Sequence, residues 1–170
     1  MSNHNADIEA FSNTYSSLQE AVRGLDVAAL TWKPGPGKWS ATEVLVHLAD
    51  HLIVVSFRIR EILSGSQTRL PAFNQDPWVE GQYGNEAEAA DVLEGFGSLA
   101  AYNVLLLRRL SPADWEKEAV NAKGDRIKLA DVVRGFAAHA AHHVGQIERI
   151  KAAEAAARGL EPLPSAREGA

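Results

Sequence analysis

The chain has 170 residues, 46% hydrophobic and 23% charged, which is the balance of a folded protein with room for one well-formed core. Its 17 Lys and Arg against 22 Asp and Glu give a net charge of −5, so no overall positive field attracts phosphates and nucleic acid is not an expected partner. The absence of cysteine excludes disulfides, thiolate nucleophiles and cysteine-ligated zinc, so any metal must be held by histidine and oxygen atoms.

Apolar residues spaced by three and four predict a first amphipathic helix over about residues 6–25. The prolines and glycines of the segment TWKPGPGKWS, residues 31–40, then end it. Ser40 and Glu43 have the spacing of a capping box, which predicts that a second helix starts directly after Ser40. This helix extends to Gly65, a residue that suits a left-handed C-terminal cap.

A long connection without helical period follows, over residues 66–84. Connections of this length usually cover a site or cross the end of a bundle. Its residues Asp76, Trp78 and Tyr83 leave two alternatives open. They form one wall of a substrate pocket, or the aromatic rings simply hold the crossover on the bundle.

Asn85 and Glu88 have the spacing of another capping pair, before a third predicted helix that extends to Leu110. The sequence SPADW, residues 111–115, predicts one short helical turn. The sequence NAKGDR, residues 121–126, predicts a tight polar turn around its glycine.

A fourth helix is predicted from about residue 128 to residue 158, in a stretch rich in alanine and free of proline. Four amphipathic helices with a long crossover between the second and the third predict an all-α four-helix bundle, because strand patterns are sparse. We expect one domain over residues 1–158 and a loosely held tail over residues 159–170.

The first residues, MSNHNADIEAF, lack the basic start and apolar stretch of a secretory signal. No apolar run is expected to approach the length of a membrane span. The sequence therefore predicts a cytoplasmic protein without a membrane partner.

Three of the six histidines lie in the sequence HAAHH, within the fourth predicted helix. Residues four apart share one face of a helix, so His139 and His143 point together into the apolar stripe, whereas His142 lies on another face. Two neutral imidazoles at this spacing can bind one divalent ion. The alternative is a pair of buried neutral side chains, each hydrogen-bonded to a neighbouring helix.

A third ligand would come from the second predicted helix, where HLADH offers His47, Asp50 and His51. His51 lies nearer the centre of the apolar stripe, which suits a closed structural site. His47 lies on the flank of the stripe beside Asp50, which suits a catalytic ion that solvent and substrate reach. Local geometry leaves both histidines open as ligands.

Three stretches in order carry a resemblance to a known family: WSATEVLVHLAD over residues 39–50, a middle segment with Asp76 and Trp78, and HAAHHVGQI over residues 139–147. The chain resembles the DinB/YfiT-like family over about residues 11–150. Members of that family are four-helix bundles with up-down-down-up connectivity that hold a divalent metal with three histidines. The resemblance thus implies this connectivity and a metal site here.

The resemblance implies metal ligands at His47, His139 and His143, and so selects His47 where geometry left a choice. Nickel and zinc both accept imidazole, and either is the expected divalent ion. An ion with three neutral ligands keeps an open position and acts as a Lewis acid toward water or a thiol. Asp50 is the candidate to move a proton there, and Gln146 is near enough to orient a ligand.

The family's relatives include thiol S-transferases that use bacillithiol, a mycothiol-dependent isomerase, and proteins described as metal-dependent hydrolases. The resemblance implies an enzyme that transfers a low-molecular-weight thiol to a small substrate, or hydrolyses that substrate. The alternative is a non-catalytic, metal-stabilised bundle that acts in self-association or partner binding. A homodimer is expected from the family and from alanine-rich helix faces that can pack closely.

Overall fold

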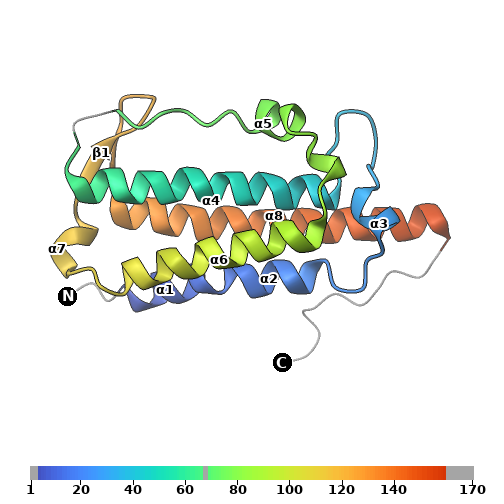
Figure 1. Ribbon diagram of the computed structural model, residues 1–170, viewed down its shortest axis with the longest axis horizontal. Coiled ribbons are helices and arrows are strands. Elements are labelled where there is room, and N and C mark those ends of the chain that lie inside the picture. Colours follow the sequence, from blue (N-terminus) through green and yellow to red (C-terminus); the bar gives the residue numbers. More distant parts are fainter. Residues whose placement is uncertain (1–3, 67–68, 160–170) are drawn as a thin grey trace.

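The computed structural model describes residues 4–66 and 69–159, and its long helices form a four-helix bundle (Figure 1). The first bundle segment, α1 with α2, runs in one direction; α4 and α6 both run in the opposite direction, and α8 returns. The all-α bundle with up-down-down-up connectivity is therefore confirmed. The helical elements are α1 (Asn5–Ser12), α2 (Thr14–Ala21), α3 (Val27–Thr31), α4 (Ala41–Ser64), α5 (Gln75–Gly81), the 3-10 helix η1 (Gly84–Glu86), α6 (Ala89–Leu107), α7 (Pro112–Trp115) and α8 (Leu129–Arg158).

The first bundle segment is two helices rather than the single predicted one. α1 and α2 meet at Asn13, and the hydroxyl of Thr14 donates to the carbonyl oxygen of Phe11 at 2.8 Å beside this junction. Phe11 and Leu18 are both fully buried on either side of it. The apolar spacing survives the junction, which is why periodicity alone predicted one helix.

The second predicted helix is confirmed as α4, together with both of its end signals. The Ser40 hydroxyl accepts from the Glu43 amide at 3.1 Å, and the Glu43 carboxylate accepts from the Ser40 amide at 2.9 Å. Gly65 ends the helix with φ of 72°, a left-handed conformation that glycine adopts without strain. Local signals therefore set both ends of the helix that carries His47, Asp50 and His51.

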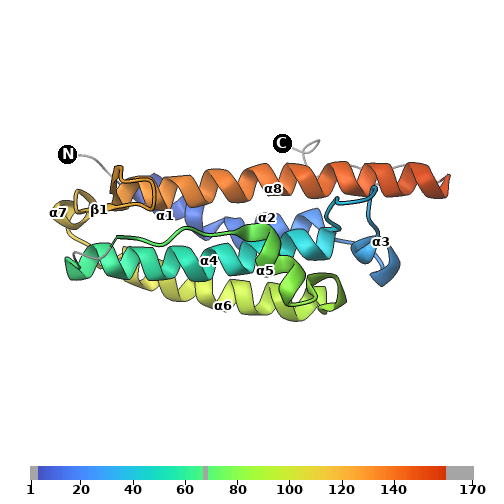
Figure 2. The same ribbon diagram turned by 90° about the horizontal axis from the view of Figure 1, so that it is seen from above.

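The long crossover is confirmed, and it contains two short helices, α5 and η1, that the sequence did not predict. Seen from above, its first part runs between α4 and α8 (Figure 2). This strap connects the end of α4 to the start of α6 at the opposite end of the bundle. The two parallel helices require such a return along the bundle's length.

The predicted capping pair before the third helix is wrong. α6 begins at Ala89 with Glu88 as its N-cap, and no side chain caps it. Asn85 instead accepts from the Ser40 hydroxyl at 2.5 Å and donates to the Thr31 carbonyl at 3.1 Å. The Asn85 side chain thus links the crossover to the start of α4 and the end of α3.

The short turn of helix predicted at SPADW is confirmed as α7. Two antiparallel strands, β1 (Glu118–Val120) and β2 (Arg126–Lys128), flank the polar turn, in which Gly124 has φ of 95°. The strands were not predicted because three residues are too few to show an alternating pattern. The hairpin leads directly into α8.

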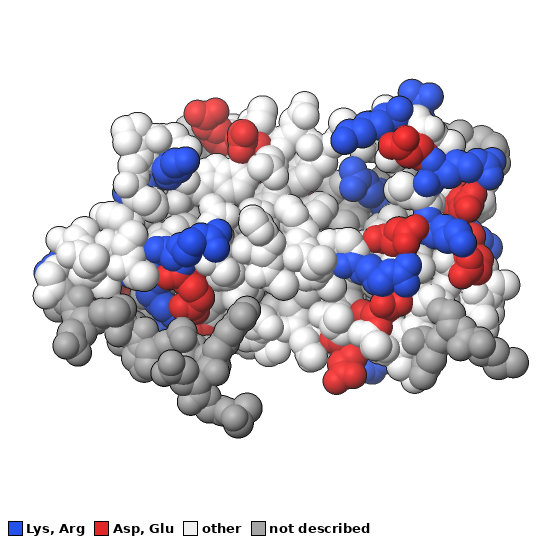
Figure 3. All heavy atoms as spheres, turned by 180° about the vertical axis from the view of Figure 1, so that it is seen from behind, with Lys and Arg blue, Asp and Glu red and all other residues white. Residues whose placement is uncertain are grey.

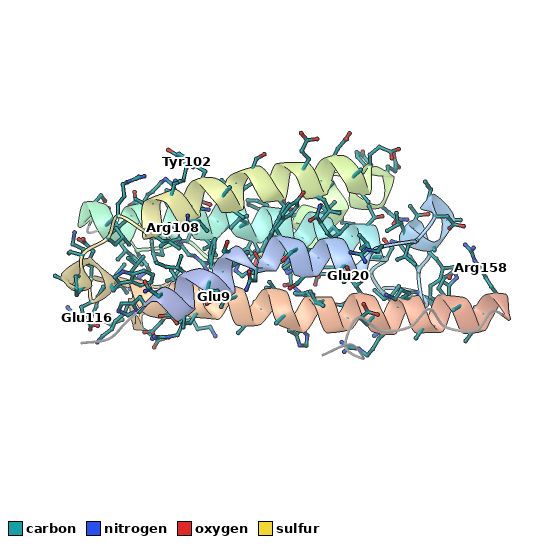
Figure 4. The ribbon with its side chains drawn as sticks, turned by 90° about the horizontal axis from the view of Figure 1, so that it is seen from below. Glu9, Glu20, Tyr102, Arg108, Glu116 and Arg158 are labelled. Atoms are coloured by element: carbon teal, nitrogen blue, oxygen red, sulfur yellow. The ribbon has the colours of Figure 1, made fainter. Side chains whose placement is uncertain are left out.

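α6 exposes apolar side chains on its outer side. By length and composition it could cross a membrane, with mean hydropathy of 1.2 over its best window, although the expectation was that no run approaches such a length. Only 28% of that window is buried. Phe96 and Leu107 belong to the core, whereas Tyr102 and Leu105 are more than half exposed, and Tyr102 points away from the bundle (Figure 4).

Charged side chains of both signs are interleaved on the face shown in Figure 3.

At the far end of α8, the Arg158 guanidinium pairs with the Asp26 carboxylate at 3.2 Å, next to the start of α3 (Figure 4). Gly159 closes α8 with φ of 71°. From residue 160 onward, the predicted tail lies outside the described residues.

Candidate metal centre

Four histidines meet in the groove between α4 and α8. His47 and His51 lie one turn apart on α4, and His139 and His143 one turn apart on α8. The ring centroid of His143 is 4.7 Å from that of His47 and 4.5 Å from that of His139, and the His51 and His139 centroids are also 4.5 Å apart. The structure thus brings the three predicted ligands together and adds His51 to them.

Three of the four histidines offer ring nitrogens close enough to share one ion. Ring nitrogens of His47, His51 and His139 all lie within 4.8 Å of one another, so these residues could hold a metal ion. Beside them, Nδ1 of His143 donates to the side-chain oxygen of Gln146 at 2.7 Å. Because that oxygen only accepts, this bond puts the proton on Nδ1 and leaves the Nε2 lone pair of His143 free. His143 therefore offers a lone pair beside the group formed by His47, His51 and His139.

The nitrogen positions fit a divalent ion. Nε2 of His47 and Nε2 of His139 are 2.9 Å apart. Two imidazoles bound at about 2.0–2.1 Å, with an angle of about 90–109° between the bonds, would place their nitrogens roughly 2.8–3.4 Å apart, a range that includes the observed distance. In addition, Nδ1 of His47 and Nδ1 of His51 are buried without a hydrogen-bond partner among the described residues. Unpaired buried polar atoms are costly, and they indicate a site completed by something beyond the protein's own atoms.

Burial keeps the cluster neutral. Desolvation, followed by repulsion from the neighbouring imidazoles, lowers the pKa of His47 and of His51 to about 3. The same causes lower the pKa of His143 to about 4, and burial also lowers the pKa of His139. All four rings are therefore uncharged at neutral pH, which is the form of histidine that binds metal ions.

Two aromatic rings cover the cluster from different elements. Phe73, on the strap, stacks over both histidines of α4, with centroid distances of 5.9 Å to His47 and 5.6 Å to His51. Trp39, directly before α4, lies 5.0 Å from His47 and 6.3 Å from His143. The sequence analysis assigned neither ring a role at the site; the only signal available was their place beside the two long loops.

Of the crossover residues singled out from the sequence, Trp78 comes nearest to the cluster. Its ring meets Phe73 edge to face at a centroid distance of 5.0 Å, and its side chain is partly exposed. Asp76 is exposed at the start of α5, and Tyr83 is 72% exposed. Trp78 therefore backs the ring that covers the histidines, whereas Tyr83 faces solvent.

Asp50 lies on a different side of α4. Its carboxylate accepts from the Gln82 amide at 2.6 Å, and both residues line a cavity of about 310 Å³ between α4, η1 and α6. Burial raises the pKa of Asp50, and the Gln82 hydrogen bond opposes that rise. In the described part of the chain, no hydrogen bond of Asp50 reaches a histidine, so the structure does not bring it to the ligands.

The remaining polar residues near the cluster have local roles. Glu43 caps α4 and accepts from the Lys33 ammonium at 2.7 Å. His142 is exposed, and its ring touches that of His143 edge to face at 5.4 Å. The separation of His142 from the inward-facing pair, expected from helical spacing, agrees with this exposure.

Solved structures of other proteins share this fold. YfiT from Bacillus subtilis, described as a probable metal-dependent hydrolase with an unusual four-helix bundle topology, matches with a TM-score of 0.83 and 19% identity, over 95% of this chain and 91% of YfiT. A mutant and a second structure of mycothiol-dependent maleylpyruvate isomerase match with TM-scores of 0.70 and 0.68, at 13% and 14% identity. These two matches cover 86% and 94% of this chain, and 61% and 74% of the isomerase chains.

At such low identities, the structural matches show the fold. None of the curated proteins matches the chain in sequence. The family model for the DinB superfamily, however, matches residues 10–147, which is most of the chain and includes both histidine pairs. The chain therefore belongs to the DinB superfamily.

Proposed function

We propose that the protein is a metal-dependent enzyme that uses His47, His139 and His143 as ligands. It would transfer a low-molecular-weight thiol to a small substrate, or hydrolyse such a substrate. The observation that carries this proposal is the convergence of neutral imidazoles from α4 and α8, with two Nε2 atoms 2.9 Å apart. A divalent ion held there, nickel or zinc, supplies Lewis-acid chemistry that lowers the pKa of a thiol or a water molecule.

The hydrogen bond from His143 to Gln146 supports His143 as the third ligand. Metal-binding histidines commonly donate their second ring nitrogen to an acceptor that fixes the ring. Gln146 does this for His143 at 2.7 Å, whereas Nδ1 of His51, like Nδ1 of His47, has no such partner among the described residues. His51 is the alternative third ligand, because its ring nitrogen lies within 4.8 Å of those of His47 and His139.

The residues around the cluster would control water and protons. Phe73 stacks on the His47 imidazole and Trp39 packs against it at a tilt, and together the two rings limit the access of bulk water. Asp50 stays the candidate proton carrier, because its pKa is raised by burial toward the range in which a carboxyl exchanges protons efficiently. Since Asp50 bonds to Gln82 and not to a histidine, Asp50→Asn should reduce activity less than His47→Ala does.

The descriptions of the structural relatives support a small substrate. YfiT is described as a probable metal-dependent hydrolase, and the isomerase depends on mycothiol, a thiol cofactor. Both reaction classes need an activated nucleophile, either water or a thiol. The choice between hydrolysis and thiol transfer therefore depends on which nucleophile the site accepts.

The alternative, a non-catalytic bundle held together by a metal, has less support from the packing. A continuous hydrophobic cluster fills the bundle along its length, with Phe11, Leu48, Phe96 and Phe136 among its fully buried members. Small domains that need a structural metal usually lack such a core. The helices here have enough apolar contact to associate without an ion.

Metal analysis of purified variants tests the ligand set. We expect about one divalent ion per wild-type chain, and loss of that ion from His47→Ala and His143→Ala with unchanged circular dichroism. His142→Ala is the matched control, because this exposed histidine should leave the metal content unchanged. Loss of metal from His51→Ala with retention by His143→Ala would instead assign His51 as the third ligand.

Activity assays then separate the functions. Metal-loaded protein is incubated with an electrophile and several cellular thiols, and in parallel with small ester and amide substrates. Turnover that requires the metal and is lost in His47→Ala supports an enzyme. Unfolding on chelation, with no turnover in any assay, would favour the structural alternative. The expected homodimer and the cytoplasmic location stay predictions, and light scattering of the purified protein tests the first.

A further inference from the structure

A second cavity continues the α4–α8 groove beyond the histidine cluster. Its volume is about 240 Å³, and its walls include His51, Val55 and Arg58 from α4 and Asp131 and Phe136 from α8. His51 is shared between this cavity and the cluster. The cavity therefore begins at the candidate metal centre and extends toward the hairpin end of the bundle.

Arg58 lies at the far end of this cavity, on the same face of α4 as the histidines. Seven residues separate it from His51, which is about 10 Å along the helix axis and only about 20° around it. Side chains on a helix lean toward its N-terminus, so the Arg58 side chain leans toward His51. A molecule lying in the groove would meet imidazole nitrogens at one end and a guanidinium at the other.

The hydrogen bonding of Arg58 is incomplete. Its Nη2 donates to the Pro71 carbonyl on the strap at 3.1 Å, but its Nε is buried without a partner. Within residues 4–66 and 69–159, no carboxylate forms an ion pair with it. Burial lowers the pKa of Arg58, yet a guanidinium stays charged in proteins. A half-buried cation with an unused donor is costly unless an anion completes it.

The acidic residue on the opposite wall is already occupied. Asp131 accepts from the Arg134 guanidinium at 2.7 Å and from the Lys128 amide at 3.4 Å. Its negative charge nevertheless limits the charge that can lie beside Arg58. At that end of the cavity, a carboxylate group with one negative charge is favoured over a phosphate group with two.

We propose that this cavity binds the carboxylate of an acidic small molecule through Arg58, and that the same molecule reaches the histidine cluster with its opposite end. This inference rests on the function proposed for the cluster. The planar fork of an arginine suits a carboxylate, which it can bind with two parallel hydrogen bonds. The separation along α4 sets roughly 6–10 Å between the carboxylate and the reacting end of the substrate.

Calorimetric titration with glutarate tests the assignment, in low-chloride buffer, on the protein as purified and again after treatment with EDTA. We expect glutarate to bind the wild type and to bind Arg58→Gln about 10- to 100-fold more weakly, the usual effect of losing charge-assisted hydrogen bonds. Arg58→Lys should recover part of the affinity because it restores the charge without the fork. Arg109→Gln, which removes an exposed arginine just beyond α6, is the matched control and should bind like the wild type.

The outcomes separate this inference from the function proposed for the cluster. Glutarate binding in EDTA needs no metal, so it is measurable even if the histidines hold no ion. Equal affinity of wild type and Arg58→Gln, or no binding by the wild type at tens of millimolar glutarate, would overturn the inference. Tighter binding of inorganic phosphate than of glutarate would overturn the choice of a carboxylate. The metal analysis of the histidine variants is independent of these results, so either proposal can fail while the other stands.

Discussion

Acid should destabilise the metal-free protein because folding keeps the clustered histidines uncharged, most strongly His47 and His51. Burial lowers the pKa of His47 and of His51 to about 3 in the folded chain, from about 6.5 in an unfolded one. Above pH 6.5 neither state binds these protons, and folding loses nothing. As the pH falls below 6.5, the unfolded chain binds protons that the folded chain excludes, so stability decreases continuously toward pH 3.

The size of this effect follows from the two pKa values. At pH 4, an unfolded histidine is almost fully protonated, while His47 and His51 are still mostly neutral in the folded protein. Each therefore lowers the free energy of unfolding by about 3 kcal/mol between pH 7 and pH 4. The pair contributes about 6 kcal/mol, which is comparable to the whole stability of a typical domain.

Urea denaturation followed by circular dichroism measures this loss, on protein dialysed against EDTA and then into buffers at pH 7 and pH 4. Between the two pH values, His47→Gln should lose about 3 kcal/mol less than the wild type, because it removes one of the buried histidines that titrate. His142→Gln is the control and should behave like the wild type, since this side chain is exposed. Equal losses in the wild type and His47→Gln would refute the argument that burial keeps this ring neutral.

Two substitutions test the packing that supports the site. Phe136→Ala should lower the free energy of unfolding by about 3–5 kcal/mol, because the ring is fully buried and lies 4.9 Å from that of Phe11; a loss below 1 kcal/mol in urea denaturation would contradict this. Asn103→Ala should cost about 1–3 kcal/mol, because it leaves the Ser56 hydroxyl and the Arg60 guanidinium without their buried amide partner. A thermal melt unchanged from the wild type would show that water replaces the amide at no cost.

The bundle was predictable where local signals agree with the fold. The Ser40–Glu43 capping box marks the start of α4 in the sequence as clearly as in the structure. The spacing of His139 and His143 places both rings on the inner side of α8, because that helix is continuous through the pair. Such signals depend on neighbours within four residues, and distant contacts have little influence on them.

Features that depend on distant contacts were not predictable. Asn85 has the sequence of a helix cap, but a hydrogen bond with Ser40, 45 residues away in the chain, takes its side chain instead. Phe73 lies in an irregular strap, and only the path of that strap over α4 brings its ring to the histidines. The choice of third ligand between His51 and His143 was not predictable for the same reason. Each lies four residues after another histidine, and the two differ only in what surrounds them in the fold.

The closest pair of nitrogens in the cluster joins residues 92 positions apart, one early in α4 and one in the middle of α8. During synthesis, the ribosome must release nearly the whole chain before these atoms can meet. An incomplete chain that ends before α8 therefore has only the pair His47 and His51 of the cluster. Two imidazoles bind an ion far less tightly than three converging ligands do. An ion at the proposed site would therefore bind tightly only to the finished molecule, and its binding would report that both halves of the chain have folded together.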